Sequence, residues 1–498
     1  MSHSILRNAV TALLAGTSAV LVAACGPTAT APTADEPAEQ QAEPAPPGTP
    51  EYVESMLARV AQKELDRGLA SLSVAIIKDG EVVFAEGYGY ANVAQQAEAT
   101  PDTYYISAST FKPVTSTALL TLVDQGKCGL DDPVNDHLGD IAVKDDPPNS
   151  VTIRRILDHT SGLSDEHGQS MHTAVSVWDA HRTGLIPAET LAAEMTTVTP
   201  AGETWRYNNT AYMLAGLLIE RISGMPYEQY VVENVLKPAG IDNGHPVFPS
   251  AAMVERMAVP YVNADGERNP TEFYFGSMYP AGLAYVTPSE MAKFLWVHLN
   301  GGEAGGNRIL SNELVEVAHT PYKEKYGLGW WTYKDEQGHT RINHGGTWYG
   351  YVTTMVGDKD NGIAVYAATN TGPTQGTYRL ADAAVRLTRG EEISLEDRQP
   401  VEIGPAILKS YEGLYLDSMM DIDMRIEAFD GGLNHLVERP ESLQGYVLEY
   451  LPASETVFFN ENMGVELHFQ VDEAGGVTGY RQTQHGWIDY GIHEKVSD

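Results

Sequence analysis

Strand-like patterns stand at both ends of a long segment of this chain, with helix-like patterns between them. Near its start, two apolar runs flank Asp79-Gly80, a strong signal for a β-hairpin. Alternating apolar runs return on either side of Asn361-Gly362, while residues of about 105–320 carry mainly helical periodicity. We therefore expect one sheet assembled from distant pieces of chain, with an inserted helical region and a cleft between the two parts.

Two helices can be placed from local signals. Residues 52–69 carry apolar side chains near helical spacing, which predicts an amphipathic helix. The stretch Thr287-Pro288-Ser289-Glu290 offers an N-cap residue, a proline at the first helical position and a capping-box glutamate. A helix should begin there.

A second folding unit is expected after Pro400 and Pro405, where helical periodicity almost disappears. Apolar residues alternate strictly from Val465 to Val471, and turn signals recur between short runs. This pattern predicts an antiparallel sheet or barrel of about 100 residues. With 498 residues the chain is too long for one ordinary core, and the expected class is α+β with two domains.

The N-terminus carries a targeting signal. Arg7 precedes a short apolar run, Ala9 to Ala24, which is typical of a signal peptide. The run ends in Ala23-Ala24-Cys25, which resembles the lipobox of bacterial lipoproteins. That resemblance implies a lipidated Cys25, and Gly26 after it implies an anchor in the outer membrane facing the periplasm. The alternative is an ordinary secretory signal with a chance cysteine.

The segment after Cys25 is expected to be a disordered tether. Residues 26–50 hold seven prolines and four acidic residues, with no basic and no aromatic residue. Such a composition cannot bury enough apolar surface to form a core.

The charge balance excludes one class of partner. The chain has 32 basic and 67 acidic side chains, a formal net charge of −35. A general nucleic-acid binder needs a basic surface to neutralise phosphates, so no nucleic acid is expected as a partner.

Ser109-Thr110-Phe111-Lys112 joins a hydroxyl and an amine at a spacing that suits catalysis. An offset of three residues places Lys112 one helical turn after Ser109, over the same face. A serine becomes a good nucleophile when a neighbouring base takes its proton, and a lysine can do so if desolvation lowers its pKa. Amide N–H groups at a helix start also favour developing negative charge.

Two stretches together resemble a known superfamily. Tyr104 to Pro113, with Ser109 and Lys112 inside it, and Ile156-Leu157-Asp158-His159-Thr160-Ser161-Gly162-Leu163 resemble the serine β-lactamases and penicillin-binding proteins. The nearest branch is that of the class C β-lactamase-related serine hydrolases, over roughly residues 55–390. The resemblance implies an antiparallel sheet flanked by helices, a serine nucleophile and no metal or organic cofactor.

The second motif of that superfamily is Tyr-x-Asn, which occurs here at Tyr90, Tyr207 and Tyr261. We choose Tyr207 because it follows Ser109 in the chain and because the residues on both sides of it resemble those of the superfamily. By resemblance, Tyr207 carries the proton between the nucleophile and the leaving group, and Asn209 holds the substrate or Lys112. A buried structural tyrosine is the alternative.

The third motif, Lys-Thr-Gly in many relatives, is represented here by His344-Gly345-Gly346-Thr347. By resemblance, Gly346 lets a strand approach the substrate closely, and the amides of Ser109 and Thr347 form an oxyanion hole. A lysine would supply a permanent cation for a substrate carboxylate, whereas His344 is only partly charged near neutrality. With this difference, the pattern looks more like that of the family's esterases and D-amino-acid peptidases than that of its β-lactamases. A hydrogen-bonded histidine without substrate contact is the alternative.

Asp165, Glu166, His167 and His172 could in principle ligate a metal. They lack an established ligand spacing, so we expect a solvated loop there and no metal site.

The sequence therefore predicts a serine hydrolase that acts through an acyl-enzyme on a small peptide, amide or ester. The first choice is a D-amino-acid-type or linear-peptide hydrolase. A carboxylesterase, a class C-like β-lactamase and a catalytically idle penicillin-binding envelope receptor are the alternatives. Membrane contact is expected through Cys25 only, and self-association is left open.

The expected division of the chain has five parts. They are a signal peptide (1–24), a tether (25–50), the hydrolase domain (51–392), a linker (393–404) and an all-β domain that resembles a lipocalin (405–498).

Overall fold

The structure is a computed structural model, and it describes most of the chain after the predicted tether. The described residues are 45–145, 150–165, 174–176, 188–242, 251–264, 267–271, 273–276, 278–323, 326–417, 422–437, 446–461, 463–484 and 488–497. The predicted signal peptide with Cys25, most of the predicted tether, and Glu166, His167 and His172 lie outside them. None of the helices in these ranges is long and apolar enough to cross a membrane.

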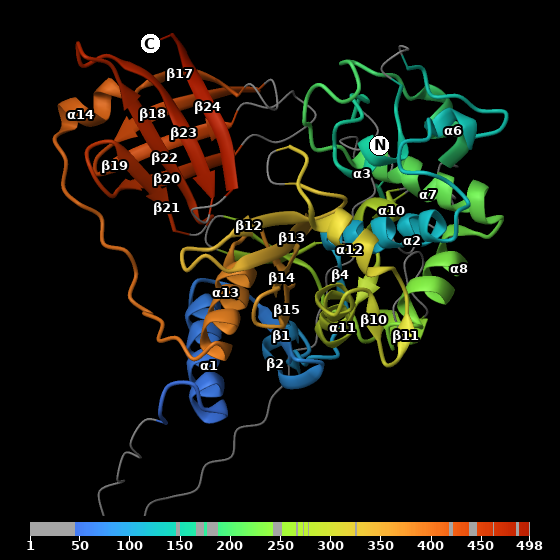
Figure 1. Cartoon of the computed structure of the whole chain (residues 1–498). Helices are drawn as coiled ribbons and strands as arrows, with labels where there is room; N and C mark the ends of the chain where they lie inside the picture. The colour runs from blue at the N-terminus through green and yellow to red at the C-terminus, as the bar shows by residue number, and fades with distance from the viewer. Residues whose placement is uncertain are drawn as a thin grey trace, which may run out of the picture. The chain divides into compact units, whose positions relative to one another are not determined.

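The central sheet has seven strands, drawn from both ends of the hydrolase segment (Figure 1). Its order is β12-β13-β14-β15-β1-β2-β3, and every neighbouring pair is antiparallel. Ser73 in β1 pairs with Ala368 in β15, so strands far apart in the sequence lie side by side. This confirms the expected sheet of distant pieces. The strands are β1 Ser71–Lys78, β2 Glu81–Asn92, β3 Ala97–Glu98, β12 Trp331–Lys334, β13 Thr340–Trp348, β14 Tyr351–Asp358 and β15 Ile363–Thr369.

Helices cover both faces of this sheet. Helices α1 (Pro50–Asp66) and α13 (Gly376–Thr388) pack on one face, whereas α11 (Pro288–Leu299) packs on the other. Successive side chains of a strand point to opposite faces. Accordingly Val74 belongs to the core under α1 and α13, and Ala75 belongs to the core on the other face.

The inserted region is mainly helical, as expected. The predicted helix start at Thr287 is confirmed, since Thr287 Oγ1 accepts from the Glu290 amide and the Glu290 carboxylate accepts from the Thr287 amide. Its other helices are α2 Lys112–Asp124, α3 Ile153–Leu157, α6 Ala188–Glu194, α7 Asn209–Ser223, α8 Tyr227–Val231, α9 Ala251–Val254, α10 Tyr279–Gly282 and α12 Asn312–His319. Short strand pairs complete it: β4 Tyr105–Ile106 with β9 Tyr285–Val286, β5 Ala174–Ser176 with β8 Tyr274–Gly276, β10 Glu303–Ala304 with β11 Asn307–Arg308, and β6 Tyr261–Ala264 with β7 Glu267–Pro270 and β16 Thr371–Gly372.

The C-terminal unit is a closed barrel, which confirms the all-β expectation. A short helix, α14 (Pro405–Ser410), precedes it. The first and last strands pair, with Leu416 opposite Glu494, so the ring closes. The strands are β17 Gly413–Asp417, β18 Ile422–Phe429, β19 Gly432–Val437, β20 Tyr446–Pro452, β21 Val457–Asn460, β22 Val465–Val471, β23 Val477–Gln484 and β24 Ile488–Ser497.

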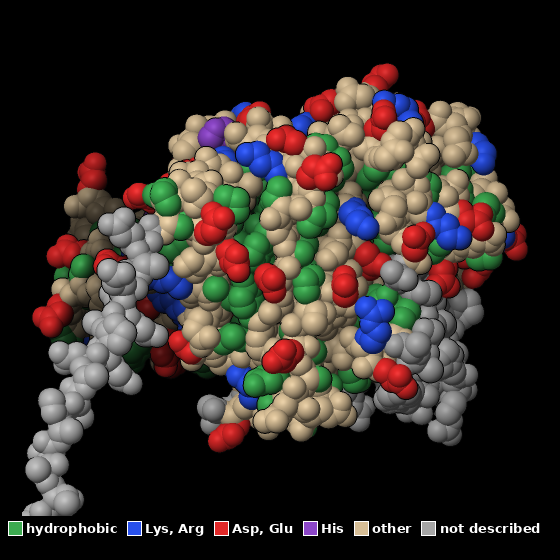
Figure 2. All heavy atoms as spheres, turned by 90° about the horizontal axis from the view of Figure 1, so that it is seen from below, with side chains coloured by type: hydrophobic (Ala, Val, Ile, Leu, Met, Phe, Trp, Pro, Cys, Tyr) green, Lys and Arg blue, Asp and Glu red, His purple; other side chains and the backbone are tan. Residues whose placement is uncertain are grey.

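Acidic side chains are spread over the face seen in Figure 2 and form no single patch there. A few basic side chains lie between them. On this face the strong negative charge of the chain is therefore dispersed, as suits a solvated surface.

Candidate active site

Ser109 lies on a tight turn that leads into α2. The turn is a 3₁₀ helix, Ala108–Phe111, and α2 continues from Lys112. Ala108 has a φ of 47°, a left-handed conformation that is costly for a residue with a side chain. Gly282 packs against this turn, because a Cβ on it would lie 2.4 Å from the Ala108 carbonyl oxygen. The backbone around Ser109 is thus held in a sparsely populated conformation by its neighbours.

Lys112 reaches back to Ser109 as the spacing predicted. Its Nζ lies 3.1 Å from Ser109 Oγ and 2.7 Å from both Asn209 Oδ1 and the Ala281 carbonyl oxygen. A neutral amine has two N–H groups and one lone pair. The charged ammonium donates to all three oxygens; in the neutral amine the amide and carbonyl oxygens can accept both N–H groups, which leaves the lone pair for the Ser109 hydroxyl.

The surroundings of Lys112 favour that neutral form. The side chain is fully buried beneath the rings of Tyr207 and Tyr212, whose centroids lie 4.8 and 5.5 Å from Nζ. Burial lowers the pKa of Lys112 to about 7, and the negative charge of Asp165 opposes the shift. A large fraction of Lys112 is therefore uncharged near neutral pH, unlike a lysine in water.

Tyr207 lies in a loop fixed by the His159 segment. The His159 ring packs on the Tyr207 ring with centroids 4.3 Å apart. His159 Nδ1 accepts from the Asn208 amide at 3.1 Å, and Asn208 Nδ2 donates to the Leu163 carbonyl at 2.7 Å. Asn208 also caps α7 by accepting from the Ala211 amide. Residues 159–163 thereby set the position of both Tyr207 and Asn209.

The Tyr207 phenol is hydrogen-bonded to the Ser109 side chain and stays protonated. Burial raises its pKa above the ordinary value, and its hydrogen bond with Ser109 only partly offsets that rise. Between the two groups beside Ser109, Lys112 is therefore the one whose pKa suits a base near neutral pH.

His344 is buried and satisfied on both ring nitrogens. Nδ1 donates to the Gly345 carbonyl at 2.7 Å, which fixes the tautomer, and Nε2 accepts from the Tyr326 hydroxyl at 3.0 Å. Burial, together with the charge of Lys112, lowers the pKa of His344 to about 3. His344 is thus neutral at neutral pH, where the sequence led us to expect partial charge.

Strand β13 passes very close to the serine turn at Gly346. A Cβ on Gly346 would lie 2.7 Å from the Ser109 amide nitrogen, whereas a Cβ on Gly345 would meet nothing within 4 Å. Thr347 follows at an exposed position, opposite Val352 of β14. Gly346 thus lets β13 lie against the serine turn, while the predicted approach of this strand to a substrate stays a prediction.

The sequence motifs that were set aside lie elsewhere. Tyr90 is in β2, and the Tyr261 hydroxyl accepts from the Val93 amide. A second stretch of the form His-x-Gly, His137-Leu138-Gly139, precedes Tyr207 in the chain, and its His137 Nε2 lies 3.0 Å from Asp132 Oδ2.

Sequence reasoning missed several groups at the site. Ala281 contributes only a carbonyl oxygen, Gly282 only the absence of a side chain, and Tyr326 a hydroxyl from a distant loop. None of these carries a motif that a single sequence could reveal. Asp165, expected in a solvated loop, is instead partly buried, and it accepts from the Thr210 amide at the start of α7. The described residues contain no cluster of His, Cys, Asp and Glu that could hold a metal ion.

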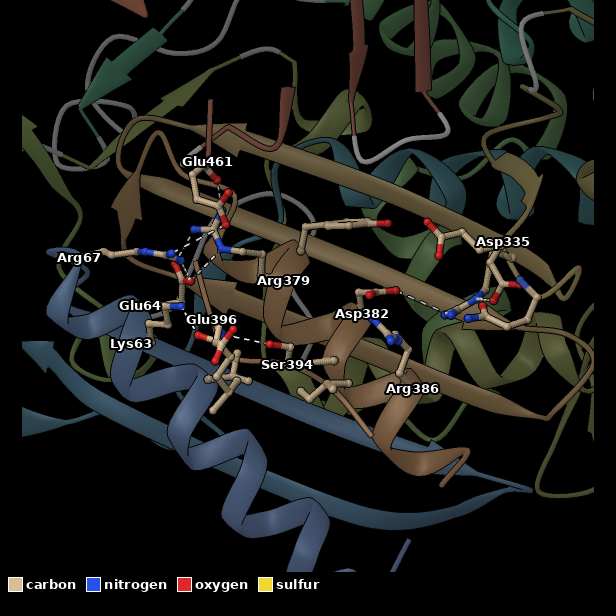
Figure 3. Close-up of a pocket in the computed structure, with 18 of the residues that line it drawn as sticks. Lys63, Glu64, Arg67, Asp335, Arg379, Asp382, Arg386, Ser394, Glu396 and Glu461 are labelled. Carbon is tan, nitrogen blue, oxygen red and sulfur yellow. Dashed lines mark hydrogen bonds and ion pairs between the residues drawn. The ribbon is translucent and has the colours of Figure 1, made fainter. Parts of the chain in front are cut away.

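A cavity of about 540 Å³ lies away from this site, beside α1 and α13 (Figure 3). Its walls are lined with paired charges, such as Glu64, which lies between Arg67 and Arg379. Neither Ser109 nor Lys112 lines it. Its size alone does not make it the reacting site, since the contact between Ser109 and Lys112 lies elsewhere.

Comparisons with known proteins agree with this geometry. The family model described as beta-lactamase matches residues 53–389. Penicillin-binding protein 4* of Bacillus subtilis is 24% identical over 440 residues, covering 80% of this chain and 90% of that protein.

Solved structures show the same fold. The octameric penicillin-binding protein homologue from Pyrococcus abyssi has a TM-score of 0.59 at 24% identity, covering 89% of this chain and 98% of its own. The D-amino acid amidase from Ochrobactrum anthropi has a TM-score of 0.56 at 22% identity, covering 68% of this chain and 98% of its own.

The family match spans more than half of the 498 residues and includes every residue described at the site above. It confirms the resemblance that the segments around Ser109 and His159 carry in the sequence. The chain belongs to the beta-lactamase family and is a serine hydrolase of that superfamily.

Proposed function

We propose that this protein hydrolyses amides through an acyl-enzyme formed on Ser109. The contact of Lys112 Nζ with Ser109 Oγ at 3.1 Å, in a buried setting, carries the proposal. Neutral Lys112 takes the hydroxyl proton while Oγ attacks the substrate carbonyl. The amides of Ser109 and Thr347 are the proposed donors to the oxyanion that forms.

Tyr207 would then carry the proton onward. Its protonated phenol lies next to both Ser109 and Lys112, so it can donate to the leaving amine as the C–N bond breaks. Lys112 then gives a proton back to Tyr207. In the second half of the cycle, water attacks the acyl-enzyme and the same groups return the proton to Ser109 Oγ.

The proposed substrates are small amino-acid amides or short peptides, with a D-residue as first choice. The neutral, buried His344 supports this, because it offers no permanent cation for a substrate carboxylate. The fold shared with a D-amino acid amidase is consistent with amide chemistry.

The proposal can be tested with a panel of D- and L-aminoacyl anilides, short linear peptides, short acyl esters and nitrocefin. Wild type should release aniline from aminoacyl anilides, and Ser109→Ala should abolish release while folding normally. Faster turnover of the acyl esters than of every anilide would favour the esterase alternative. Efficient nitrocefin turnover abolished in Ser109→Ala would instead identify a β-lactamase.

A receptor without catalysis is the candidate from another class. A fluorophosphonate probe separates it from an enzyme, because such probes react with an activated serine. We expect labelling of wild type at Ser109 and none of Ser109→Ala. Unlabelled wild type would support the receptor and contradict the proposed hydrolase.

We further propose that the mature protein is attached to the outer membrane through a lipid on Cys25, on the periplasmic side. The lipobox-like residues before Cys25 support this. In bacteria fed a labelled fatty acid, wild type should take up label and Cys25→Ser should not. If neither protein takes up label, the lipid anchor is refuted and the alternative, an ordinary secretory signal, is supported.

A further inference from the structure

Asp165 is a carboxylate at the active site that no motif assigns. Its Oδ1 accepts from the Thr210 amide at 2.8 Å, and the Asn209 amide also donates to this carboxylate. Both amides belong to the first turn of α7, the helix that begins at Asn209. Asp165 therefore holds the turn whose Asn209 side chain bonds to Lys112 at 2.7 Å.

The other titratable groups around Lys112 are neutral at neutral pH. From β13, His344 has a pKa lowered to about 3 by burial, and from the loop after α3, His159 has a pKa lowered by burial and by Lys112. From α7 and the residue before its cap, Tyr212 and Tyr207 have pKa values raised by burial. Within the described part of the chain, Asp165 is the negative charge that acts on Lys112.

The helix start favours the ionised form of Asp165. Burial raises the pKa of its carboxyl group overall, but hydrogen bonds from the Thr210 amide and hydroxyl, the charge of Lys112 and the Asn209 amide act in the opposite direction. An anion at the N-terminus of a helix also gains from the aligned peptide dipoles.

We propose that Asp165 is a positioning residue for Lys112. It fixes the turn that carries Asn209, and its charge sets the pH range in which Lys112 works as a base. This inference rests on the proposed function of Ser109 and Lys112. The inference adds that two opposing effects set the basicity of the Lys112 amine. Desolvation by the surrounding rings favours the neutral amine, and attraction by the Asp165 carboxylate favours the charged one.

Two substitutions separate the charge from the structural bond. Asp165→Asn keeps an Oδ1 that can accept from the Thr210 amide but removes the charge. Asp165→Glu keeps the charge on a longer side chain. Asp131→Asn is the matched control, because Asp131 is an exposed carboxylate paired with Arg154 on another part of the surface.

The measurement is the rate of fluorophosphonate labelling at Ser109 from about pH 5 to about pH 9. In this reaction Ser109 Oγ forms a bond to phosphorus, the P–F bond breaks, fluoride leaves and the hydroxyl proton goes to Lys112. It reports on Lys112 without any assumption about the natural substrate.

Wild type should show a rate that rises through pH about 7. In Asp165→Asn the rise should move to lower pH by about one unit, the low end of the effect of one neighbouring opposite charge. The variant should therefore label faster than wild type at acid pH, and more slowly at alkaline pH because its amine is a weaker base. Asp165→Glu and Asp131→Asn should rise at the wild-type pH.

If Asp165→Asn labels more slowly but its rate rises at the same pH as in wild type, the inference is overturned. Asp165 would then only cap α7, and the proposed function would be unaffected. Wild type that labels at no pH would overturn the proposed function and this inference with it. Thermal melts check folding, and Asp165→Ser, which also accepts at a helix start, replaces Asp165→Asn if that variant does not fold.

Discussion

At the scale of single residues, the serine turn leaves no room for a methyl group on either side. Gly282 faces the Ala108 carbonyl and Gly346 faces the Ser109 amide, in both cases closer than a Cβ can approach. Gly345, the neighbour of Gly346, faces open space. Gly346 therefore has no room for a side chain, whereas Gly345 has, so alanine substitutions at these two adjacent positions can be compared.

Gly346→Ala should lower the rate of Ser109 acylation by at least tenfold. The new methyl would displace the Ser109 amide, and loss of one oxyanion donor commonly costs about 10²–10³ in rate. The variant should also lose roughly 1–3 kcal/mol of stability through overpacking. Fluorophosphonate labelling and thermal melts measure the two effects. Gly345→Ala is the control, and equal losses in both variants would refute the argument from close approach.

Lys112→Met should lower acylation by about 10²–10⁴, the usual contribution of a positioned general base. Methionine fills a similar volume without a titratable group, so the protein should remain folded. In wild type, the rate should rise with pH through about 7, because protonated Lys112 cannot accept the Ser109 proton. A Lys112→Met variant that keeps the same rise would show that another group is the base.

At the scale of elements, helices α11 and α12 are joined by two buried histidines. His298 Nε2 donates to Thr117 Oγ1 at 2.9 Å, since that hydroxyl already donates to the Pro113 carbonyl. His298 Nδ1 then accepts from His319 Nε2 at 3.2 Å, and His319 Nδ1 has no hydrogen-bond partner among the described residues. Both rings are thus fixed as neutral, and a proton added to either would find no acceptor.

Acid should therefore loosen the packing of α11 and α12. Burial lowers the pKa of His298 to about 3, below the ordinary 6.5 of the unfolded chain. Its contribution to stability is complete above pH 6.5 and is lost as the pH falls toward 3. His298→Gln, which can keep both bonds, should lower the pH dependence of the free energy of unfolding by about 1 kcal/mol per pH unit between those limits.

Urea unfolding at several pH values measures this dependence, with fluorescence of the nearby Trp330 as one signal. His468→Gln is the control, because His468 is partly exposed on the barrel. A His298→Gln variant with the wild-type pH dependence would refute the role of the pair.

Elements with a strong local signal could be predicted from the sequence. The Asp79-Gly80 hairpin, the Thr287 capping box and the alternation from Val465 to Val471 all formed as expected, because turn chemistry and side-chain periodicity act over a few residues. The contact between Ser109 and Lys112 could be predicted for the same reason, because the two residues lie only one helical turn apart in the sequence.

What could not be predicted depends on contacts between distant elements. The Ala281 carbonyl reaches Lys112 only because α10 packs beside the serine turn, and a carbonyl has no signature in the sequence. The expected partial charge of His344 was wrong because burial, which a sequence does not state, decides its protonation. Asp165 was placed in a solvated loop because its partners, Asn209 and Thr210, lie more than forty residues further along the chain, at the start of α7.

At the scale of the whole molecule, the described residues form separate hydrophobic cores. Two of them lie on the two faces of the central sheet, and the third is the interior of the barrel. Among the described residues, the buried core of the barrel runs from Leu408 to Tyr480, with partly buried neighbours beginning at Ile403. Because the barrel is closed, it has no unpaired edge strand that needs a partner for stability.

The barrel should consequently fold when it is produced alone. Residues 400–498 contain every described residue of its core, so we expect β-rich circular dichroism and one cooperative thermal transition. Residues 45–398 should keep fluorophosphonate labelling at Ser109, because the groups that contact Ser109 and Lys112 lie between Asp165 and Thr347 or within α2 itself. Loss of the cooperative transition in the fragment would show that the barrel depends on the hydrolase domain. Loss of labelling in the shortened hydrolase, if it melts like the full chain, would instead show that the barrel takes part in forming the site.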